Sequence, residues 1–285
     1  MSRGLWITVG TALGVAGVGG ALLLGRRASA ASLPTPTDAP LPPLDLARLP
    51  PLDLAPLPTA SDVEGDLTTN WGNTPVDLRP LFMKMEETAQ IVGAARIFAT
   101  IAVRESKFVT TAHNGDAPEE QSERDASRRA YTNNNERNPP LRHGERAADF
   151  GSGGLFGLLS PYFLWTGVPE VGSKAPLLNA PPELVFQPRA AAFGAAVYLQ
   201  RLLANYRIDD HADLKAGWAS PSLLTSGRGG KTYQDVRARF LADAKTLGID
   251  LGDTSTIPSR LDASAWPGVL AVFAALVGTL PKEFT

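Results

Sequence analysis

The stretch FATIAVRESKFVTTAHNGD, from Phe98 to Asp116, places a carboxylate, Glu105, at the end of an apolar run. Apolar residues upstream of Glu105 recur at spacings of three and four, which is the period of one face of an α-helix. Glu105 continues this stripe, whose other members are Ile91, Ala94, Ala95, Phe98, Ile101 and Ala102. The stretch predicts a helix that ends with an acidic side chain on its apolar face.

A glutamate at the end of an apolar stripe has two interpretations. In the first, the side chain reaches solvent or pairs with a neighbour such as Arg104 or Lys107, and it stabilises the fold little. In the second, burial against apolar side chains disfavours the charged form of a carboxyl group, which can then act as a general acid. The stripe alone leaves both interpretations open.

Similar periodicity predicts further helices. Helical spacing begins near Pro80, and another helix starts at Pro188 and ends near Arg207. A third runs from about Tyr233 to Leu247, where Gly248 is a natural stop. The predicted fold class is therefore mainly α.

The segment between the first and second of these regions has a different character. From His113 to Phe150 it is polar and rich in turn-forming residues, and Glu119 to Tyr131 is compatible with a short exposed helix. The glycine-rich segment from Gly151 to Gly167 predicts a turn followed by a short helix. Because no convincing alternating pattern occurs, we expect at most a small β element, within the polar insertion.

The N-terminus contains an uncharged run of 20 residues, Leu5 to Leu24, between Arg3 and the pair Arg26 and Arg27. This length is enough to span a bilayer. The alternative is a cleaved signal peptide, since the residues Ala28 to Ala30 have the small-x-small form of a cleavage site. The run is longer than the roughly 7–15 residues usual in a signal peptide, so an uncleaved membrane anchor is the favoured prediction.

A proline-rich segment follows the anchor and contains a tandem repeat, LPPLDLAR at Leu41 to Arg48 and LPPLDLAP at Leu49 to Pro56. Dense prolines favour extended polyproline II, which suits a spacer that holds a domain away from a membrane. A disordered tether without a length requirement is equally compatible with this composition. A docking site for an assembly partner is a third alternative.

The last part of the chain includes a second uncharged stretch, Ala263 to Leu280, which Pro267 and Gly268 interrupt. The dozen or so residues that remain predict a packed helix rather than a membrane span. The predicted divisions are therefore an anchor at residues 1–27, a proline-rich linker at 28–74, a globular domain at 75–250 and a C-terminal apolar helix or tail at 251–285.

Composition excludes several classes of function. A formal net charge of −2 gives no basic footprint for nucleic acid. The chain has no cysteine, which excludes disulfides, thiolate zinc sites and a cysteine nucleophile. Its three histidines, His113, His143 and His211, lack the spacing of paired metal ligands, so we expect no metal and no cofactor.

Three motifs occur in a characteristic order. They are Glu105-Ser106 followed by Phe108, then GGLFGLLSP from Gly153 to Pro161, and then QPRAAAFGAAVYLQRLL from Gln187 to Leu203. Together they resemble the lytic transglycosylases of the soluble, goose-type lysozyme-like superfamily. In that family a Glu-Ser pair closes a helix, a Gly-Leu-Met-Gln-type turn follows, and a later helix carries a Gly-x-x-Tyr-Leu pattern. The resemblance covers roughly residues 81–247.

Two positions depart from the family pattern. Gly157 stands where the family usually has a glutamine that contacts sugar. The family's Ala-Tyr-Asn-Ala-Gly segment corresponds at best to KAGWASPS, from Lys215 to Ser222, with Trp218 as the aromatic residue.

The resemblance implies a lysozyme-like helical domain that cleaves the β-1,4 bond between N-acetylmuramic acid and N-acetylglucosamine in peptidoglycan strands. Glu105 would be the general acid and then the base that yields a 1,6-anhydro product. The implied sugar contacts are Ser106, Gly154, Phe156, Tyr198 and Trp218. The domain would be anchored in a bacterial inner membrane, or in a membrane-containing virion, and would face the cell wall.

Two alternatives to lytic cleavage stay open. A hydrolytic muramidase of the inverting type needs a second carboxylate roughly 6.5–9.5 Å from the first. The sequence offers Asp116, Glu119, Glu120 and Asp149 for that role. The other alternative is a catalytically silent protein that binds peptidoglycan or assists assembly.

Overall fold

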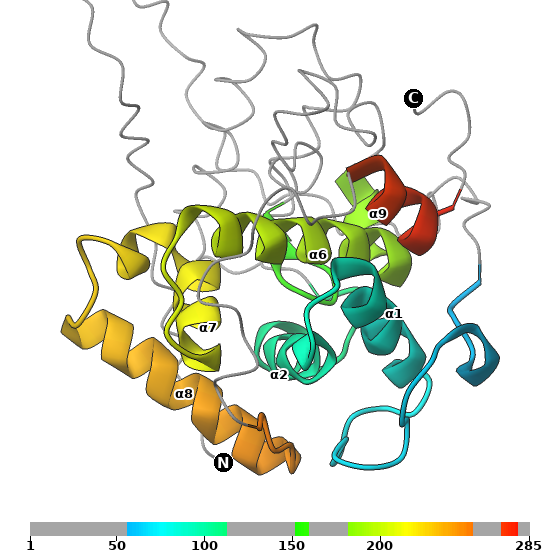
Figure 1. Ribbon diagram of the computed structural model, residues 1–285, viewed down its shortest axis with the longest axis horizontal. Helices are drawn as coiled ribbons and strands as arrows, with labels where there is room; N and C mark the ends of the chain where they lie inside the picture. Colours follow the sequence, from blue (N-terminus) through cyan, green and yellow to red (C-terminus); the bar gives the residue numbers. More distant parts are fainter. Residues whose placement is uncertain (1–55, 113–151, 160–181, 253–268, 279–285) are drawn as a thin grey trace, which may run out of the picture.

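The structure is a computed structural model that describes residues 56–112, 152–159, 182–252 and 269–278. Within these residues the fold is mainly helical (Figure 1), as the sequence predicts. The helices are α1 (Arg79–Ala89), α2 (Ala94–Ser106), α6 (Pro188–Asn205), α7 (His211–Ala219), α8 (Lys231–Leu247) and α9 (Val269–Leu276). The remaining elements are strands β1 (Ser152–Gly153) and β2 (Leu158–Leu159) and the 3-10 helices η2 (Ala60–Asp62), η5 (Pro182–Phe186) and η6 (Pro221–Leu224).

Some predictions concern parts of the chain outside the described residues. They include the N-terminal anchor at Leu5 to Leu24, the linker repeat up to its last residue, and the polar insertion from His113 to Phe150. Among the residues that are described, none of the helices combines the length and apolar character needed to cross a bilayer.

Helix α2 lies near the centre of the view in Figure 1, with α1 on one side and α7 and α8 on the other. The predicted apolar stripe is buried: the side chains of Ala94, Ala95, Phe98, Ile101 and Ala102 have no solvent exposure. The helix prediction for this segment is therefore confirmed.

The helical region predicted from Pro80 onward consists of two helices. Helix α1 ends at Gln90, whose φ of 55° is left-handed, and α2 begins after Gly93, whose φ is 85°. A left-handed residue cannot continue a right-handed helix. Ile91, the first member of the stripe, therefore lies buried in the connection rather than in α2.

Helix α6 packs against α1, α7 and α9, and this explains why it is apolar on most of its surface. It begins at Pro188 as predicted and ends at Asn205, close to the predicted end at Arg207. The prediction for α8 is also confirmed. That helix ends at Leu247, and Gly248 follows with a φ of 82° and donates its N–H to the carbonyl of Lys245.

The prediction of a turn plus short helix from residue 151 is wrong for the part that the structure describes. Strands β1 and β2 form an antiparallel hairpin in which Ser152 lies opposite Leu159 and Gly153 lies opposite Leu158. Gly154 and Gly157 take positive φ values of 73° and 58° at the two ends of the turn. These values exclude a continuous right-handed helix, so the small β element lies after the polar insertion.

The packed part of the chain begins before residue 75, where the sequence placed the end of the linker. Trp71 has no solvent exposure, and its Nε1 donates to the carbonyl of Asp66 at 2.9 Å. The guanidinium of Arg96 lies 3.8 Å above its ring. A single tryptophan with its polar partners anchors this segment, which lacks the apolar periodicity that would have revealed it.

Helix α9 confirms the predicted packed helix near the C-terminus, although it is shorter than expected. Its Phe273 packs edge-on against Phe193 of α6, with ring centroids 5.3 Å apart. Arg189, near the start of α6, donates to the carbonyl oxygens of Ala275 and Leu276 at the end of α9 and to that of Pro56. One side chain therefore joins the first and last described segments.

Candidate functional site around Glu105

Glu105 is the penultimate residue of α2, and its side chain is 24% exposed. The chain turns sharply after it, since Lys107 and Phe108 have φ values of 52° and 65°. The N–H of Lys107 donates to the carbonyl of Val103 at 3.2 Å and closes the helix. The carboxylate therefore stands at the end of a buried helix, where water or a ligand can reach it.

The partner of Glu105 is Lys215 of α7, whose ammonium donates to Oε1. The Lys215 side chain is 9% exposed, a degree of burial that lysine rarely shows without a partner. A carboxylate near the C-terminus of a helix is disfavoured by the helix dipole. Lys215 offsets that cost. Arg104, one of the partners that the sequence suggested, pairs with Asp243 instead.

Gly157 of the hairpin lies directly against the carboxylate. A Cβ atom at this position would stand 2.8 Å from Oε2 of Glu105 and 3.0 Å from its Cβ. Such contacts are too short for any side chain, and the φ of 58° also favours glycine. The glycine that departs from the family pattern is thus the residue that this packing requires.

Ser106 lies beneath the site and is buried. Its Oγ lies 2.8 Å from the carbonyl oxygen of Leu155 in the hairpin turn and 3.0 Å from that of Ala102 in α2. The hydroxyl therefore holds the hairpin against the end of α2. With both contacts inside the protein, Ser106 does not present its hydroxyl to a ligand in this structure, contrary to the role that the resemblance implied.

The predicted aromatic contacts lie in one cluster. The rings of Tyr198 and Trp218 meet edge-on with centroids 5.0 Å apart, and Phe156 lies 6.5 Å from Trp218. The hydroxyl of Tyr198 donates to the carbonyl of Gly217 at 3.2 Å.

The members of this cluster differ in burial. Phe156 is fully buried and Trp218 is 8% exposed, whereas Tyr198 is half-buried. Phe156 is therefore a core residue beneath the site rather than a surface for sugar. Gly154 is likewise a turn residue, because a Cβ there would overlap the carbonyl of Val185.

Two functional candidates escaped the sequence analysis, Lys215 as a partner of Glu105 and Asp243 of α8. Asp243 accepts two hydrogen bonds from Arg104, at 2.5 and 2.7 Å. Burial raises the pKa of Asp243, and the Arg104 hydrogen bond offsets only part of that effect. These partners are more than a hundred residues apart in the chain, so no local spacing could have shown them.

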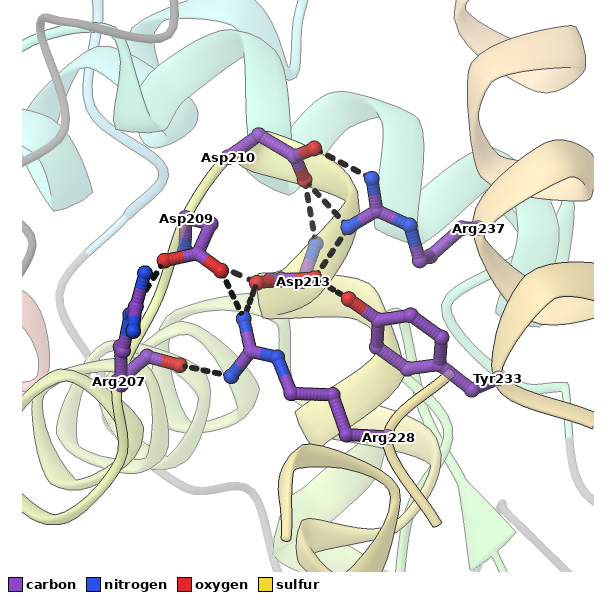
Figure 2. Close-up of polar contacts among 7 residues, drawn as sticks. All are labelled: Arg207, Asp209, Asp210, Asp213, Arg228, Tyr233 and Arg237. Atoms are coloured by element: carbon purple, nitrogen blue, oxygen red, sulfur yellow. Dashed lines mark hydrogen bonds and ion pairs between the residues drawn. The ribbon is translucent and has the colours of Figure 1, made fainter. Parts of the chain in front are cut away.

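A second group of charges lies at the start of α7 (Figure 2). Asp213 is fully buried and accepts hydrogen bonds from both guanidinium groups of the cluster, from a tyrosine hydroxyl and from a backbone N–H. The residues drawn are Arg207, Asp209, Asp210, Asp213, Arg228, Tyr233 and Arg237. This network fixes α7 to α8, and Lys215 lies only two residues beyond Asp213.

Burial and hydrogen bonding shift the pKa values within this network in opposite directions. Burial alone would raise the pKa of Asp210, but hydrogen bonds from Arg237 and from the N–H of Asp213 outweigh it and lower that pKa. Burial, with the hydrogen bond to Asp213, raises the pKa of Tyr233. The carboxylates are therefore stabilised in their charged form and the phenol in its neutral form.

Other predicted ligands are not brought to Glu105 by the described structure. The second carboxylates suggested for hydrolysis lie outside the described residues: Asp116, Glu119, Glu120 and Asp149. Within the described ranges, no group of three or more histidine, aspartate or glutamate side chains is arranged to hold a metal ion.

The comparisons with known proteins add no relative to this picture. No family model, no curated protein and no solved structure matches the chain. What the structure establishes is a mainly helical fold in which a glutamate, a lysine, a glycine turn and an aromatic cluster converge.

Proposed function

We propose that this protein is a peptidoglycan lytic transglycosylase with a lysozyme-like domain. The observation that carries the proposal is the convergence of the three motifs on Glu105. Gly157 of the hairpin touches its carboxylate, Ser106 ties the hairpin to α2, and Trp218 packs on Tyr198 of α6. Residues about 50 and 110 positions away in the sequence thus meet at one carboxylate, in the order that the family motifs require.

The proposed reaction uses one protein carboxylate. Glu105 gives its proton to the glycosidic oxygen as the bond to C1 of N-acetylmuramic acid breaks, and the substrate's acetamido group supports the cation that develops. The resulting carboxylate then takes the proton of the C6 hydroxyl, whose oxygen bonds to C1. The products are a 1,6-anhydro end and a free 4-hydroxyl, and Glu105 ends as it began.

The state of Asp243 favours this route over hydrolysis. An inverting hydrolase needs a second carboxylate to activate water. Asp243 interacts electrostatically with Lys215, but both of its oxygens already accept hydrogen bonds from Arg104. Within the described residues, the second carboxylate of this site is therefore committed to another partner.

The proposal extends to location and partners. Leu5 to Leu24 would anchor the chain in a bacterial inner membrane or a membrane-containing virion, with the enzymatic domain on the wall side. The proline-rich linker would span the distance to the glycan strands or hold an assembly partner.

A second candidate function is a silent peptidoglycan-binding protein. The ion pair between Lys215 and Glu105 favours it, because a carboxylate held by a cation is not in the protonated form that an acid catalyst needs. The low exposure of Trp218 also limits the aromatic surface available to sugar.

The test uses the full chain, purified in detergent and incubated with isolated cell walls beside Glu105→Gln and the control Asp235→Asn. Asp235 is an exposed carboxylate of α8 paired with Lys231, so its variant controls for loss of a charge. We expect wild type and Asp235→Asn to release fragments with 1,6-anhydro ends, detected by mass spectrometry, and Glu105→Gln to release about 10²- to 10⁴-fold fewer. Reducing ends in place of anhydro ends would identify a hydrolase, and no release by wild type would favour the silent protein.

A further inference from the structure

Lys215 is placed with more care than a surface ion pair needs. Its side chain is 9% exposed, and its ammonium reaches Glu105 across the gap between α7 and the end of α2. Removing a lysine from water costs several kcal/mol before any pairing repays it. A pair at this position therefore has a role beyond adding stability.

The backbone that carries Lys215 is held on both sides. Toward the N-terminus of α7, Asp213 receives hydrogen bonds from Arg228, Arg237 and Tyr233 (Figure 2). Toward the C-terminus, the carbonyl of Gly217 accepts from Tyr198. With α7 fixed at two points, the ammonium has little freedom to leave the carboxylate by movement of the helix.

The other charges around the pair come from α2 and α8. Arg104 precedes Glu105 in α2, Asp243 of α8 binds Arg104 and feels the charge of Lys215, and Arg239 acts on Asp243 in turn. The described hairpin residues, 152–159, include no charged side chain. Lys215 is thus the cation that directly contacts the Glu105 carboxylate among the described residues.

From this geometry we infer that Lys215 is the positioning residue of Glu105 in the reaction proposed above, on which this inference rests. The ammonium holds the carboxyl group against the Gly157 turn and stabilises the carboxylate that forms when the proton passes to the leaving oxygen. Lys215 keeps its own protons throughout, because Glu105 regains one from the C6 hydroxyl.

This role has a cost that makes it measurable. A cation beside a carboxyl group favours loss of its proton, so fewer molecules carry the protonated acid as the pH rises. Lys215 should therefore raise the turnover of the protonated enzyme and, at the same time, place the alkaline limb of the activity profile at a lower pH.

The experiment compares full-length wild type with Lys215→Met, which keeps the apolar stem and removes the charge, and with Lys215→Arg, which restores a cation. Cleavage of isolated walls is followed from pH 4 to 9. We expect Lys215→Met to lower kcat about tenfold or more and to move the alkaline limb up by about one pH unit, with KM little changed. Lys215→Arg should keep the limb within about 0.3 of the wild-type pH, since the charge is conserved.

A second readout does not depend on activity. In protein labelled with ¹³C at the glutamate Cδ, the Glu105 resonance is assigned by its absence in Glu105→Gln and titrated in wild type and Lys215→Met. We expect the midpoint to rise by about one pH unit in Lys215→Met. Circular dichroism and thermal unfolding confirm that each variant is folded. Should Lys215→Met not fold, Lys215→Gln replaces it.

The outcomes separate the two proposals. Equal loss of activity at every pH in Lys215→Met, or an unmoved Glu105 titration, would overturn the role of Lys215 while an active wild type leaves the proposed function standing. A wild type that releases no wall fragments overturns the proposed function, whether or not the Glu105 titration moves. A displaced alkaline limb that Lys215→Arg restores supports both.

Discussion

Helix α7 carries two charged residues, Asp213 and Lys215, in very different surroundings. Asp213 has no exposure and receives hydrogen bonds from Arg228, Arg237, Tyr233 and the N–H of Asp209. Lys215 binds one carboxylate, Glu105, which is 24% exposed.

The contrast separates a structural network from a candidate for chemistry. A buried carboxylate with every lone pair satisfied has nothing left to offer a ligand, and its value lies in the elements it joins. Glu105 has one cationic partner within the described residues, a glycine that leaves no room for a side chain, and an exposed edge. It also occupies a helix end where a carboxylate is electrostatically disfavoured, which a sequence selected for stability alone would avoid.

The largest expected effect on stability comes from the structural side of this comparison. Asp213→Asn leaves Arg228 and Arg237 without their shared charged partner, so the free energy of unfolding should fall by about 3–5 kcal/mol. Urea denaturation measures it. Glu105→Gln in parallel should change the same quantity by less than about 1 kcal/mol, because its edge is exposed. A larger loss in Glu105→Gln than in Asp213→Asn would reverse the assignment of the two sites.

The next effect tests the contact between the hairpin and the acid. Gly157→Ala forces a left-handed alanine and a Cβ into the Glu105 carboxylate, which should lower the free energy of unfolding by about 1–2 kcal/mol. Displacement of the acid should lower wall cleavage about 10- to 100-fold. Gly229→Ala is the matched control, since Gly229 also has a positive φ, 81°, but open space around its Cβ position. Equal activity losses in the two variants would show that strain rather than contact with Glu105 is responsible.

Acid should weaken the network around Asp213. The pKa of Asp210 is lowered in the folded protein relative to the unfolded chain, so its contribution to stability is present above about pH 4 and is lost as the pH falls below it. Urea denaturation of wild type and Asp210→Asn at pH 7 and pH 3 measures the difference. The gap between the two proteins should narrow at pH 3, where the wild-type carboxyl group is also becoming neutral. A gap that does not narrow would contradict the pairing of Asp210 with Arg237.

The smallest effect belongs to an ion pair outside both sites. Lys231 and Asp235 of α8 pair at 2.7 Å, but the Lys231 side chain is 89% exposed. Lys231→Ala should change the free energy of unfolding by less than about 0.5 kcal/mol, because solvent screens the pair. Thermal unfolding at low and high salt checks this expectation. A loss comparable to that of Asp213→Asn would mean that burial does not distinguish the charges of this protein.

The sequence allowed the prediction of those helices that have both a buried and an exposed face. The periodic stripes of α2 and α8, with Gly248 as a stop, predicted their extents closely. Helix α7 was not predicted because eight of its nine residues are buried, so it has no polar face to give a period. The hairpin was misread because Gly154 and Gly157 replace a helical turn by positive φ values.

The site was predictable in part. Glu105 stands out in the sequence, and the motifs that follow it are brought to it in the structure. Phe156 and Ser106 were given to the ligand although they are buried, because sequence patterns do not distinguish a residue beneath a site from one on it. Lys215 pairs across 110 positions, a relation that only the folded chain reveals.

The three hydrogen bonds of Arg189 have a consequence for how the protein unfolds. Because one guanidinium binds Pro56, Ala275 and Leu276, the opening and closing segments of the described fold share an attachment to α6. Neither segment can detach without releasing a contact of the other, so the two ends should lose protection from hydrogen exchange in a single step rather than fray one after the other. Any force that a tether exerts at Pro56 would therefore be resisted by the C-terminal helix as well.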